Sequence, residues 1–188
     1  MTKVLAAALE LQQFFQQRQW SFSVIGGIAL SRWGQPRTTG DVDVTLVTGF
    51  GSEDQYIRQL LGEFRPRMQD AEEFALRSRV LLLKASNDIG LDVALAGLPF
   101  EERLAQRASD YDFGGVVLRT ASAEDMIVLK AFAGRPQDWI DVEGIIVRQA
   151  NTLNWNQIVA ELTPLCELKE APEIVDRLLE LRDRLTAD

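Results

Sequence analysis

Apolar residues recur every three to four positions over residues 3–19, which predicts an amphipathic helix. The short apolar run 22–25 predicts a strand, and the diglycine Gly26-Gly27 ends it and opens a helix that reaches Trp33. Residues 41–47 alternate polar and apolar side chains, with β-branched residues at the apolar positions. This alternation is typical of a strand with one buried face.

The middle of the chain continues as a mixture of helices and strands. Ser52 and Gln55 have the spacing of a capping box, so a helix is expected from there to about Glu63. The other predicted elements are a helix over 70–77, a strand hairpin formed by 79–85 and 89–96, a helix over 99–107 that Pro99 opens, and a strand over 115–119.

From Ser122 onward only helical periodicity remains, with Ser122 as the expected N-cap. The predicted helices cover residues 122–133, 136–149, 154–163 and 172–185. We therefore expect an α+β fold, in which a small mixed sheet flanked by helices is followed by a helical C-terminal part. The shift in pattern places the division between an α/β core of residues 1–120 and a helical region of residues 121–188.

Composition narrows the chemistry. The chain of 188 residues has no histidine and one cysteine, and its net charge is −8. Without histidine, a metal site has to be built from carboxylates, which select hard ions such as Mg²⁺ or Mn²⁺. The negative charge argues against wholesale binding to a phosphate backbone. No apolar run approaches the length of a membrane span and no signal peptide is evident, so we expect a cytoplasmic protein with no membrane partner.

Three aspartates lie in predicted strands. Asp41 and Asp43 are two positions apart, so both side chains point to the same face of their strand, and their mutual repulsion is relieved by a divalent cation. Asp92 lies between Leu91 and Val93 and is the candidate third ligand of a two-metal site. The alternatives are that the Asp41–Asp43 pair belongs to an ordinary solvated strand and that Asp92 is a surface acid of an edge strand.

The diglycine lies where a strand meets the N-terminus of a helix. With no Cβ at Gly26 or Gly27, backbone N–H groups can approach a phosphate, and the helix dipole favours an anion there. Taken alone, the pair is equally explained as a tight turn between the two elements.

Together these segments resemble the nucleotidyltransferase superfamily related to DNA polymerase beta. Its signature is a diglycine, a spacer, Asp-x-Asp on a strand and a later Asp on a neighbouring strand. The start Gly-Gly-Ile-Ala-Leu at 26–30 and the Arg-Thr-Thr-Gly-Asp-Val-Asp at 37–43 look most like the abortive-infection, AbiEii-type toxin branch. The helix segment 125–131 and the Arg-x-x-Asp-x-x-Asp of residues 135–141 match that branch as well.

The resemblance implies a role for each matching residue. Gly26 and Gly27 would cradle the triphosphate of an NTP such as ATP, while Arg37 and Thr39 would shape the turn before the aspartates, with Arg37 also near phosphate. Many superfamily members have serine after the diglycine. Ile28 stands here instead, so backbone amides or Ser31, one turn further on, would make that contact.

The resemblance also implies the catalytic groups. Asp41, Asp43 and Asp92 would ligate the metal ions, with Asp92 as a possible acceptor of the proton from the attacking hydroxyl. Lys130 would pair with the β- and γ-phosphates, and Asp138 would orient it. The alternatives are that Lys130 is a surface lysine of an amphipathic helix and that Asp138 and Asp141 are surface acids paired with Arg135.

The expected reaction is transfer of a nucleotide from an NTP to an acceptor hydroxyl on tRNA or another RNA, a protein or a small molecule. A patch of arginines could guide RNA; its members are Arg58, Arg65, Arg67, Arg77 and Arg79. The branch resemblance raises a toxin role with an antitoxin partner. Two rival hypotheses remain: a catalytically silent protein that binds nucleotide or metal, and an interaction protein whose acids only keep it soluble.

Overall fold

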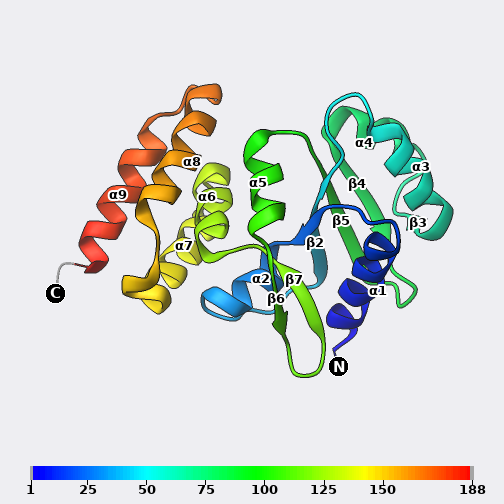
Figure 1. The fold of residues 1–188 in the computed structure, drawn as a ribbon, viewed down its shortest axis with the longest axis horizontal. Helices are drawn as coiled ribbons and strands as arrows, with labels where there is room; N and C mark the ends of the chain where they lie inside the picture. The colour runs from blue at the N-terminus through cyan, green and yellow to red at the C-terminus, as the bar shows by residue number, and fades with distance from the viewer. Residues whose placement is uncertain (1, 187–188) are drawn as a thin grey trace. The chain divides into compact units, whose positions relative to one another are not determined.

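The structure is a computed structural model that describes residues 2–186. The chain forms two compact units (Figure 1). Among the described residues, the first unit comprises 2–28 and 38–121, and the second comprises 29–37 and 122–186. The division expected from the sequence put residues 29–37 with the α/β core, whereas their contacts group them with the helical residues.

The strands of the first unit confirm the predicted mixed sheet. They are β1 Phe22–Val24, β2 Asp41–Val47, β3 Arg65–Pro66, β4 Val80–Lys84, β5 Gly90–Ala96, β6 Ser109–Asp112 and β7 Val117–Thr120. Within residues 2–186 these seven strands form one sheet in the order β3-β4-β5-β2-β1-β7-β6. β2 is parallel to β5 and antiparallel to β1, and β4 and β5 form the expected antiparallel hairpin.

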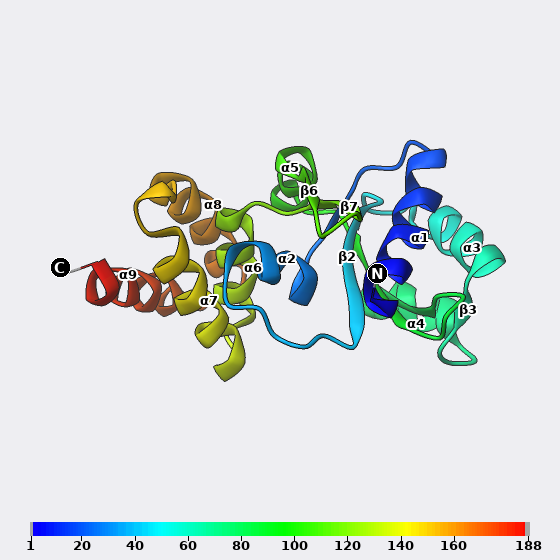
Figure 2. The same cartoon turned by 90° about the horizontal axis from the view of Figure 1, so that it is seen from below.

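The two faces of β2 have different surroundings. Val42, Val44 and Leu46 are buried in the main hydrophobic core, which also contains Leu11 and Phe15 of the first helix. Residues at i and i+2 of a strand share a face, so Asp41 and Asp43 lie on the opposite face. Figure 2 shows the first helix packed along one side of β2. The alternating sequence of this strand thus separates a buried apolar face from a polar one.

The helices of the first unit follow the predicted order. They are α1 Lys3–Gln17, α2 Gly26–Trp33, α3 Glu53–Glu63, α4 Ala71–Ser78 and α5 Pro99–Arg107, and α2 continues into the second unit at Ala29. The expected capping box at Ser52 is wrong, because within residues 2–186 the Ser52 side chain makes no capping hydrogen bond. Its backbone, with φ −119° and ψ 4°, departs from the extended conformation that N-caps adopt.

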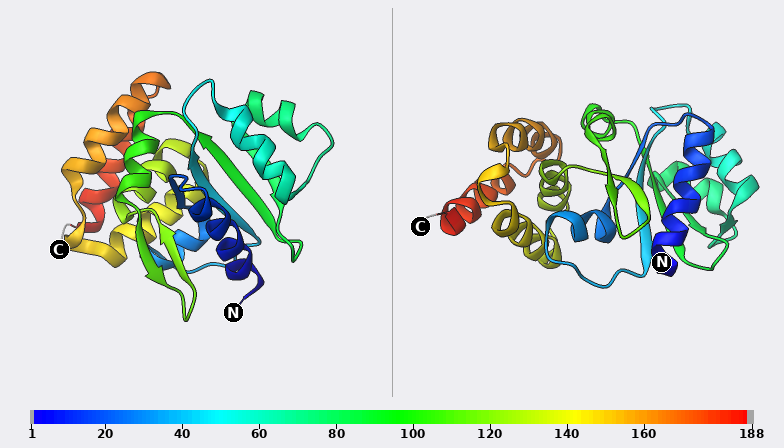
Figure 3. Two further views of the ribbon diagram at one scale, coloured as in Figure 1. Left: turned by 45° about the vertical axis from the view of Figure 1, so that its right-hand side comes forward. Right: turned by 60° about the horizontal axis from the view of Figure 1, so that its bottom comes forward.

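Helices make up the rest of the second unit, and Figure 3 shows them packed side by side. They are α6 Ala123–Ala133, α7 Pro136–Gln149, the short 3₁₀ helix η1 Ala150–Thr152, α8 Trp155–Leu168 and α9 Glu173–Thr186. Ser122 caps α6 as expected, since its side chain accepts a hydrogen bond from the Asp125 N–H. None of the helices in the described part of the chain is long and apolar enough to cross a membrane.

The secondary structure differs from the prediction at α8, β3 and β6. The helix expected to end at residue 163 runs on as α8 with Pro164 inside it, because Leu165 and Cys166 are buried and their packing offsets the missing backbone hydrogen bond. Strands β3 and β6 are not predicted, because all of their residues are exposed and neither carries an alternation of apolar and polar side chains.

Candidate active site

The three candidate acids of the first unit lie on the same face of its sheet. β2 and β5 are parallel neighbours, and their register sets Asp43 opposite Asp92 and Asp41 opposite Gly90. Adjacent strands are about 4.8 Å apart, so the side chains of Asp43 and Asp92 project from neighbouring positions on the sheet. Asp41 lies two positions before Asp43 and therefore shares this face. The sheet register thus places all three carboxylates on one surface.

Asp43 lies against the start of α2. Gly26 has a positive φ of +59°, and a Cβ at this position would come within 1.9 Å of Oδ2 of Asp43. The absence of a side chain at Gly26 is therefore what allows this carboxylate to reach the backbone at the helix N-terminus. The helix dipole stabilises negative charge at that end. Gly27 makes a similar close approach to the side chain of Thr39.

Asp92 forms an ion pair with Arg67. The side chains are 34% and 26% exposed, respectively, so the pair is partly shielded from water. Burial raises the pKa of Asp92, the negative charge of Asp41 raises it further, and the Arg67 guanidinium opposes both effects. The charge of Asp41 acting on Asp92 indicates that these two carboxylates face a common region.

The three aspartates have the chemistry to bind a hard cation, but their side chains are not arranged around one metal position. Within residues 2–186, no group of three or more His, Cys, Asp or Glu side chains is arranged to hold a metal ion. The sequence predicts three converging carboxylates that serve as the ligands of a two-metal site. Instead, the side chain of Asp92 is turned to Arg67, and that of Asp43 lies against Gly26. Their oxygen donors on one sheet face fit Mg²⁺ or Mn²⁺ in chemistry.

Thr39 stabilises the segment that leads into β2. Its hydroxyl donates a hydrogen bond of 3.0 Å to the carbonyl oxygen of Asp41, which fixes the turn that presents the aspartates. Ile28, where many superfamily members have serine, is 3% exposed and belongs to the hydrophobic core. Its side chain therefore serves packing.

In the second unit, Lys130 lies between two buried acids. Its Nζ is 3.0 Å from Oδ1 of Asp138 and 2.9 Å from Oδ2 of Asp141, and its side chain is 10% exposed. The contact with Asp141 is an ion pair without hydrogen-bond alignment, since Oδ2 of Asp141 has no hydrogen-bond partner among the described residues. Lys130 is thus a buried cation with two counter-ions, and the interpretation as a surface lysine is wrong.

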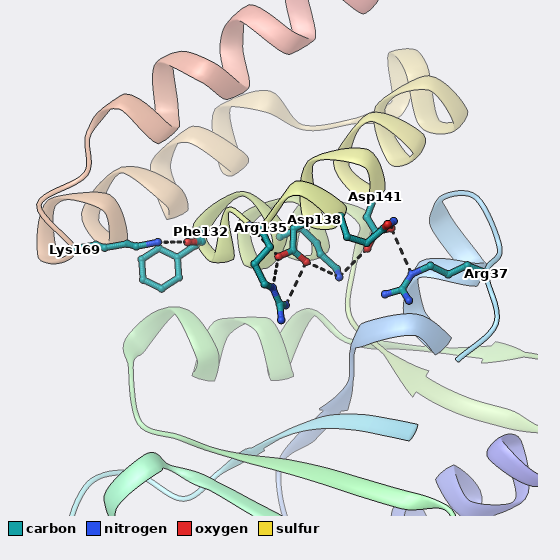
Figure 4. Close-up of polar contacts among 8 residues, drawn as sticks. Arg37, Phe132, Arg135, Asp138, Asp141 and Lys169 are labelled. Atoms are coloured by element: carbon teal, nitrogen blue, oxygen red, sulfur yellow. Dashed lines mark hydrogen bonds and ion pairs between the residues drawn. The ribbon is translucent and has the colours of Figure 1, made fainter. Parts of the chain in front are cut away.

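Two arginines extend this network (Figure 4). Arg135 Nε donates to Oδ2 of Asp138 over 2.6 Å, and Arg37 Nε lies 3.5 Å from Oδ1 of Asp141. Burial alone would raise the pKa of Asp138, but its hydrogen bonds from Arg135 and Lys130 outweigh burial and hold the pKa below the usual value. Asp138 and Asp141 are buried, so neither is the surface acid of the alternative interpretation.

The structure sorts the candidate residues into two groups. Those of the first unit are Gly26, Gly27, Thr39, Asp41, Asp43 and Asp92. Those of the second unit are Ser31, Arg37, Lys130 and Asp138, and the backbone carbonyl of Ser31 lies 3.5 Å from Nη1 of Arg148 in α7. Arg67 was missed as a member of the first group, because nothing in the local sequence signals that it reaches Asp92, 25 positions away.

The arginines proposed as a patch for RNA are largely neutralised. Arg65, Arg67 and Arg79 each pair with a carboxylate, from Asp88, Asp92 and Glu53 respectively. Arg58 pairs with both Asp54 and Glu72. These ion pairs reduce the net positive charge that a phosphate backbone would meet.

Comparison with known proteins identifies the family. A family described as "Nucleotidyltransferase of unknown function (DUF6036)" matches residues 2–174. The chain belongs to this family. The nucleotidyltransferase resemblance is thereby confirmed, whereas the assignment to the AbiEii-type branch stays a prediction. Among curated proteins, none matches this chain.

Solved structures support the same fold. An antigenic nucleotidyltransferase-like protein from Paracoccidioides brasiliensis matches with a TM-score of 0.56 and 18% identity, over 94% of this chain and 92% of that one. The lincosamide antibiotic adenylyltransferase LnuA, in its lincomycin-bound form, matches with a TM-score of 0.51 and 12% identity, over 77% of this chain and 96% of that one. The α+β nucleotidyltransferase fold expected from the sequence is confirmed.

Proposed function

We propose that this protein is a Mg²⁺- or Mn²⁺-dependent nucleotidyltransferase that moves a nucleoside monophosphate from an NTP to an acceptor hydroxyl. The observation that carries the proposal is the register of β2 and β5, which sets Asp43 beside Asp92 with Asp41 on the same face. Membership of a nucleotidyltransferase family supports the class of reaction.

In this reaction an acceptor oxygen attacks the α-phosphorus, the bond to the β-phosphate oxygen breaks, and pyrophosphate leaves. Asp41, Asp43 and Asp92 are the residues proposed to hold the divalent ion, whose chemistry is to neutralise the developing charge on phosphate. Asp92 is also proposed to accept the hydroxyl proton.

The proposed nucleotide contacts belong to both groups of residues. In the first unit, Gly26, Gly27 and Thr39 surround the start of α2, where N–H groups and the helix dipole favour phosphate. In the second unit, Ser31, Arg37, Lys130 and Asp138 are proposed as nucleotide contacts, with Lys130 as the cation and Asp138 holding its position.

The test combines binding with turnover. Calorimetry with each NTP and Mg²⁺ or Mn²⁺ measures affinity, and a coupled assay measures pyrophosphate release in the presence of candidate acceptors. Release that disappears in Asp43→Asn supports the enzyme. Tight binding of nucleotide without release on any acceptor contradicts it and favours the silent nucleotide-binding protein. An unaltered affinity for the metal in Asp41→Ala and Asp92→Ala would favour the interaction protein.

A small hydroxylated molecule is the acceptor class we propose to test first. The arginines that would have attracted RNA are paired with acids, and the net charge of −8 opposes a long phosphate backbone. The fold neighbour LnuA is described as acting on a lincosamide antibiotic, which is such a molecule. Cell extract incubated with labelled NTPs, followed by mass spectrometry, separates this acceptor from tRNA, other RNA and protein.

The proposed toxin role, with an antitoxin or another protein as partner, depends on the motifs shared with the AbiEii-type branch. It predicts that expression arrests bacterial growth and that Asp43→Ala restores growth at the same expression level. Normal growth with the unaltered protein would remove the toxin role and leave the nucleotidyltransferase proposal standing.

A further inference from the structure

The edge of the sheet places Arg67 beside the acidic face, which is the surface of β2 and β5 that carries Asp41, Asp43 and Asp92. Arg67 directly follows β3, in which Pro66 is in register with Leu83, and its own N–H donates to the carbonyl of Leu82 over 3.0 Å. Leu82 in turn is in register with Asp92. The backbone of Arg67 is therefore fixed beside β4, and this one strand separates it from the aspartate in β5 that its guanidinium contacts.

The guanidinium of Arg67 borders two of the three acids. One terminal nitrogen, Nη2, donates to Oδ1 of Asp92. The other, Nη1, lies 3.0 Å from the point where a Cβ of residue 90 would stand, and Oδ1 of Asp41 lies 2.3 Å from the same point. Because residue 90 is glycine, this space is open to both groups. Arg67 thus brings one positive charge to the region that Asp41 and Asp92 share.

A divalent ion and this guanidinium would both bind the carboxylate of Asp92. An arginine offers donors but no lone pair, so it cannot be a ligand to a metal itself. Its positive charge also repels a cation. The charge of Arg67 therefore weakens the binding of an ion by Asp92 and Asp41, and movement of the guanidinium away from Oδ1 of Asp92 would remove that repulsion.

We propose that Arg67 is an internal counter-ion that neutralises the acidic face when no metal is bound and is displaced from Asp92 when the metal enters. This inference rests on the proposed metal-dependent function and adds the residue that sets the affinity for the ion. Arg67 is a positioning residue here: it competes for an acid and takes no part in the reaction.

The test measures Mn²⁺ binding by calorimetry on full-length Arg67→Gln. Its dissociation constant is expected to fall roughly fivefold to twentyfold, as removal of a nearby unit charge predicts. Thermal unfolding in EDTA should occur at a lower Tm than in the unaltered protein, and Mn²⁺ should raise that Tm by a larger amount. Arg67→Lys, which keeps the charge, should restore a dissociation constant close to the original.

Arg65→Gln is the matched control. Arg65 lies in β3, two positions before Arg67, and its partner Asp88 is outside the acidic face, so the variant loses the same charge elsewhere. Its Mn²⁺ dissociation constant should change by less than about twofold, because exposed charges at a distance are screened. An equal gain in affinity for Arg65→Gln and Arg67→Gln would overturn the inference, since net charge alone would then explain both.

Two outcomes separate this inference from the function on which it rests. If the unaltered protein binds Mn²⁺ and Arg67→Gln binds it equally well, the counter-ion role is wrong and the metal-dependent function stands. If neither protein binds Mn²⁺, the counter-ion role and the metal-dependent function are both wrong. NMR provides a test without a destabilised variant: the Arg67 side-chain NH signal, assigned by its loss in Arg67→Lys, should shift as Mg²⁺ is added. An unchanged signal at saturating Mg²⁺ would contradict displacement.

Discussion

Both units contain aspartates close to basic side chains, but they neutralise them differently. In the second unit, Asp138 and Asp141 have side chains only 2% and 3% exposed and are matched by Lys130 and two arginines. In the first unit, Asp92 remains 34% exposed beside Arg67, and Asp41 is exposed. A buried acid has to carry its counter-charge within the fold, whereas an acid on an open strand face can take one from a ligand.

The comparison implies that the first group serves chemistry, and that the second network stabilises the fold in addition to the nucleotide contacts proposed for its residues. Removing a charge from each group should therefore affect different measurements. Losses of activity with retained stability are expected in the first unit, whereas in the second unit a loss of stability should accompany the loss of nucleotide binding.

The largest effect is expected for the acids of the first unit. Asp43→Asn and Asp92→Asn should each lower pyrophosphate release by roughly 10³-fold, because a neutral amide is a poor ligand for a hard cation. Their Tm should stay near that of the unaltered protein. Asp88→Asn, which removes an exposed acid paired with Arg65, is the control and should keep its activity. Equal losses in all three variants would erase the proposed difference between the acids.

The second prediction concerns Lys130. Lys130→Met leaves Asp138 and Asp141 buried without their shared cation, so the free energy of unfolding should fall by about 3–5 kcal/mol. Urea denaturation followed by tryptophan fluorescence measures it. Lys169→Met is the matched control, because Lys169 is exposed, donates to the carbonyl of Phe132 and lies over that ring. A loss as small as that of the control would contradict a structural network.

The third prediction distinguishes two costs of a side chain at Gly26: the steric clash with Asp43 and the strain of a positive φ. Gly26→Ala places a Cβ against the carboxylate of Asp43 and should cost about 2 kcal/mol or more. Gly49→Ala also has a positive φ, of +71°, but open space around it, and should cost only about 1 kcal/mol. Activity should fall in Gly26→Ala alone. Equal behaviour of the two variants would show that the contact with Asp43 is dispensable.

The smallest effect is expected from pH. The pKa of Asp138 is lowered in the folded protein, so its stabilising contribution is present above the ordinary pKa and is lost as the pH falls through the folded value. The free energy of unfolding, followed by urea denaturation at a series of pH values, should therefore drop below about pH 4. Asp138→Asn should be less stable at pH 7 and show a smaller acid-induced loss. An identical pH dependence in both proteins would contradict the assignment.

Much of the fold was predictable because its periodicity is local. The alternation of residues 41–47 defines β2 at both ends, and Pro99 marks the start of α5. Strand β6 has no such signal, since its pairing with β7 is decided by hydrogen bonds and all its side chains are exposed. Pro164 led to a helix end predicted too early, because the burial of its neighbours outweighs the tendency of proline to end a helix.

The candidate site was predictable only in part, for a related reason. The spacing of Asp41 and Asp43 shows that they share a face, and Asp92 stands out among apolar neighbours. The positions of their side chains depend on contacts distant in sequence. Arg67 reaches Asp92 through the pairing of β3 with β4, and Gly26 accommodates Asp43 through the turn after β1. Neither contact leaves a mark in the local pattern.

The register of β2 and β5 also has a consequence for how the protein folds. A slip of one residue between these strands would turn every side chain of the moving strand to the other face. Asp92 would then enter the apolar interior and Val93 would be exposed, and burying an unpaired carboxylate is costly. Asp92, which we propose for chemistry, therefore also helps to specify the register of the sheet, because the mispaired arrangement has a higher free energy.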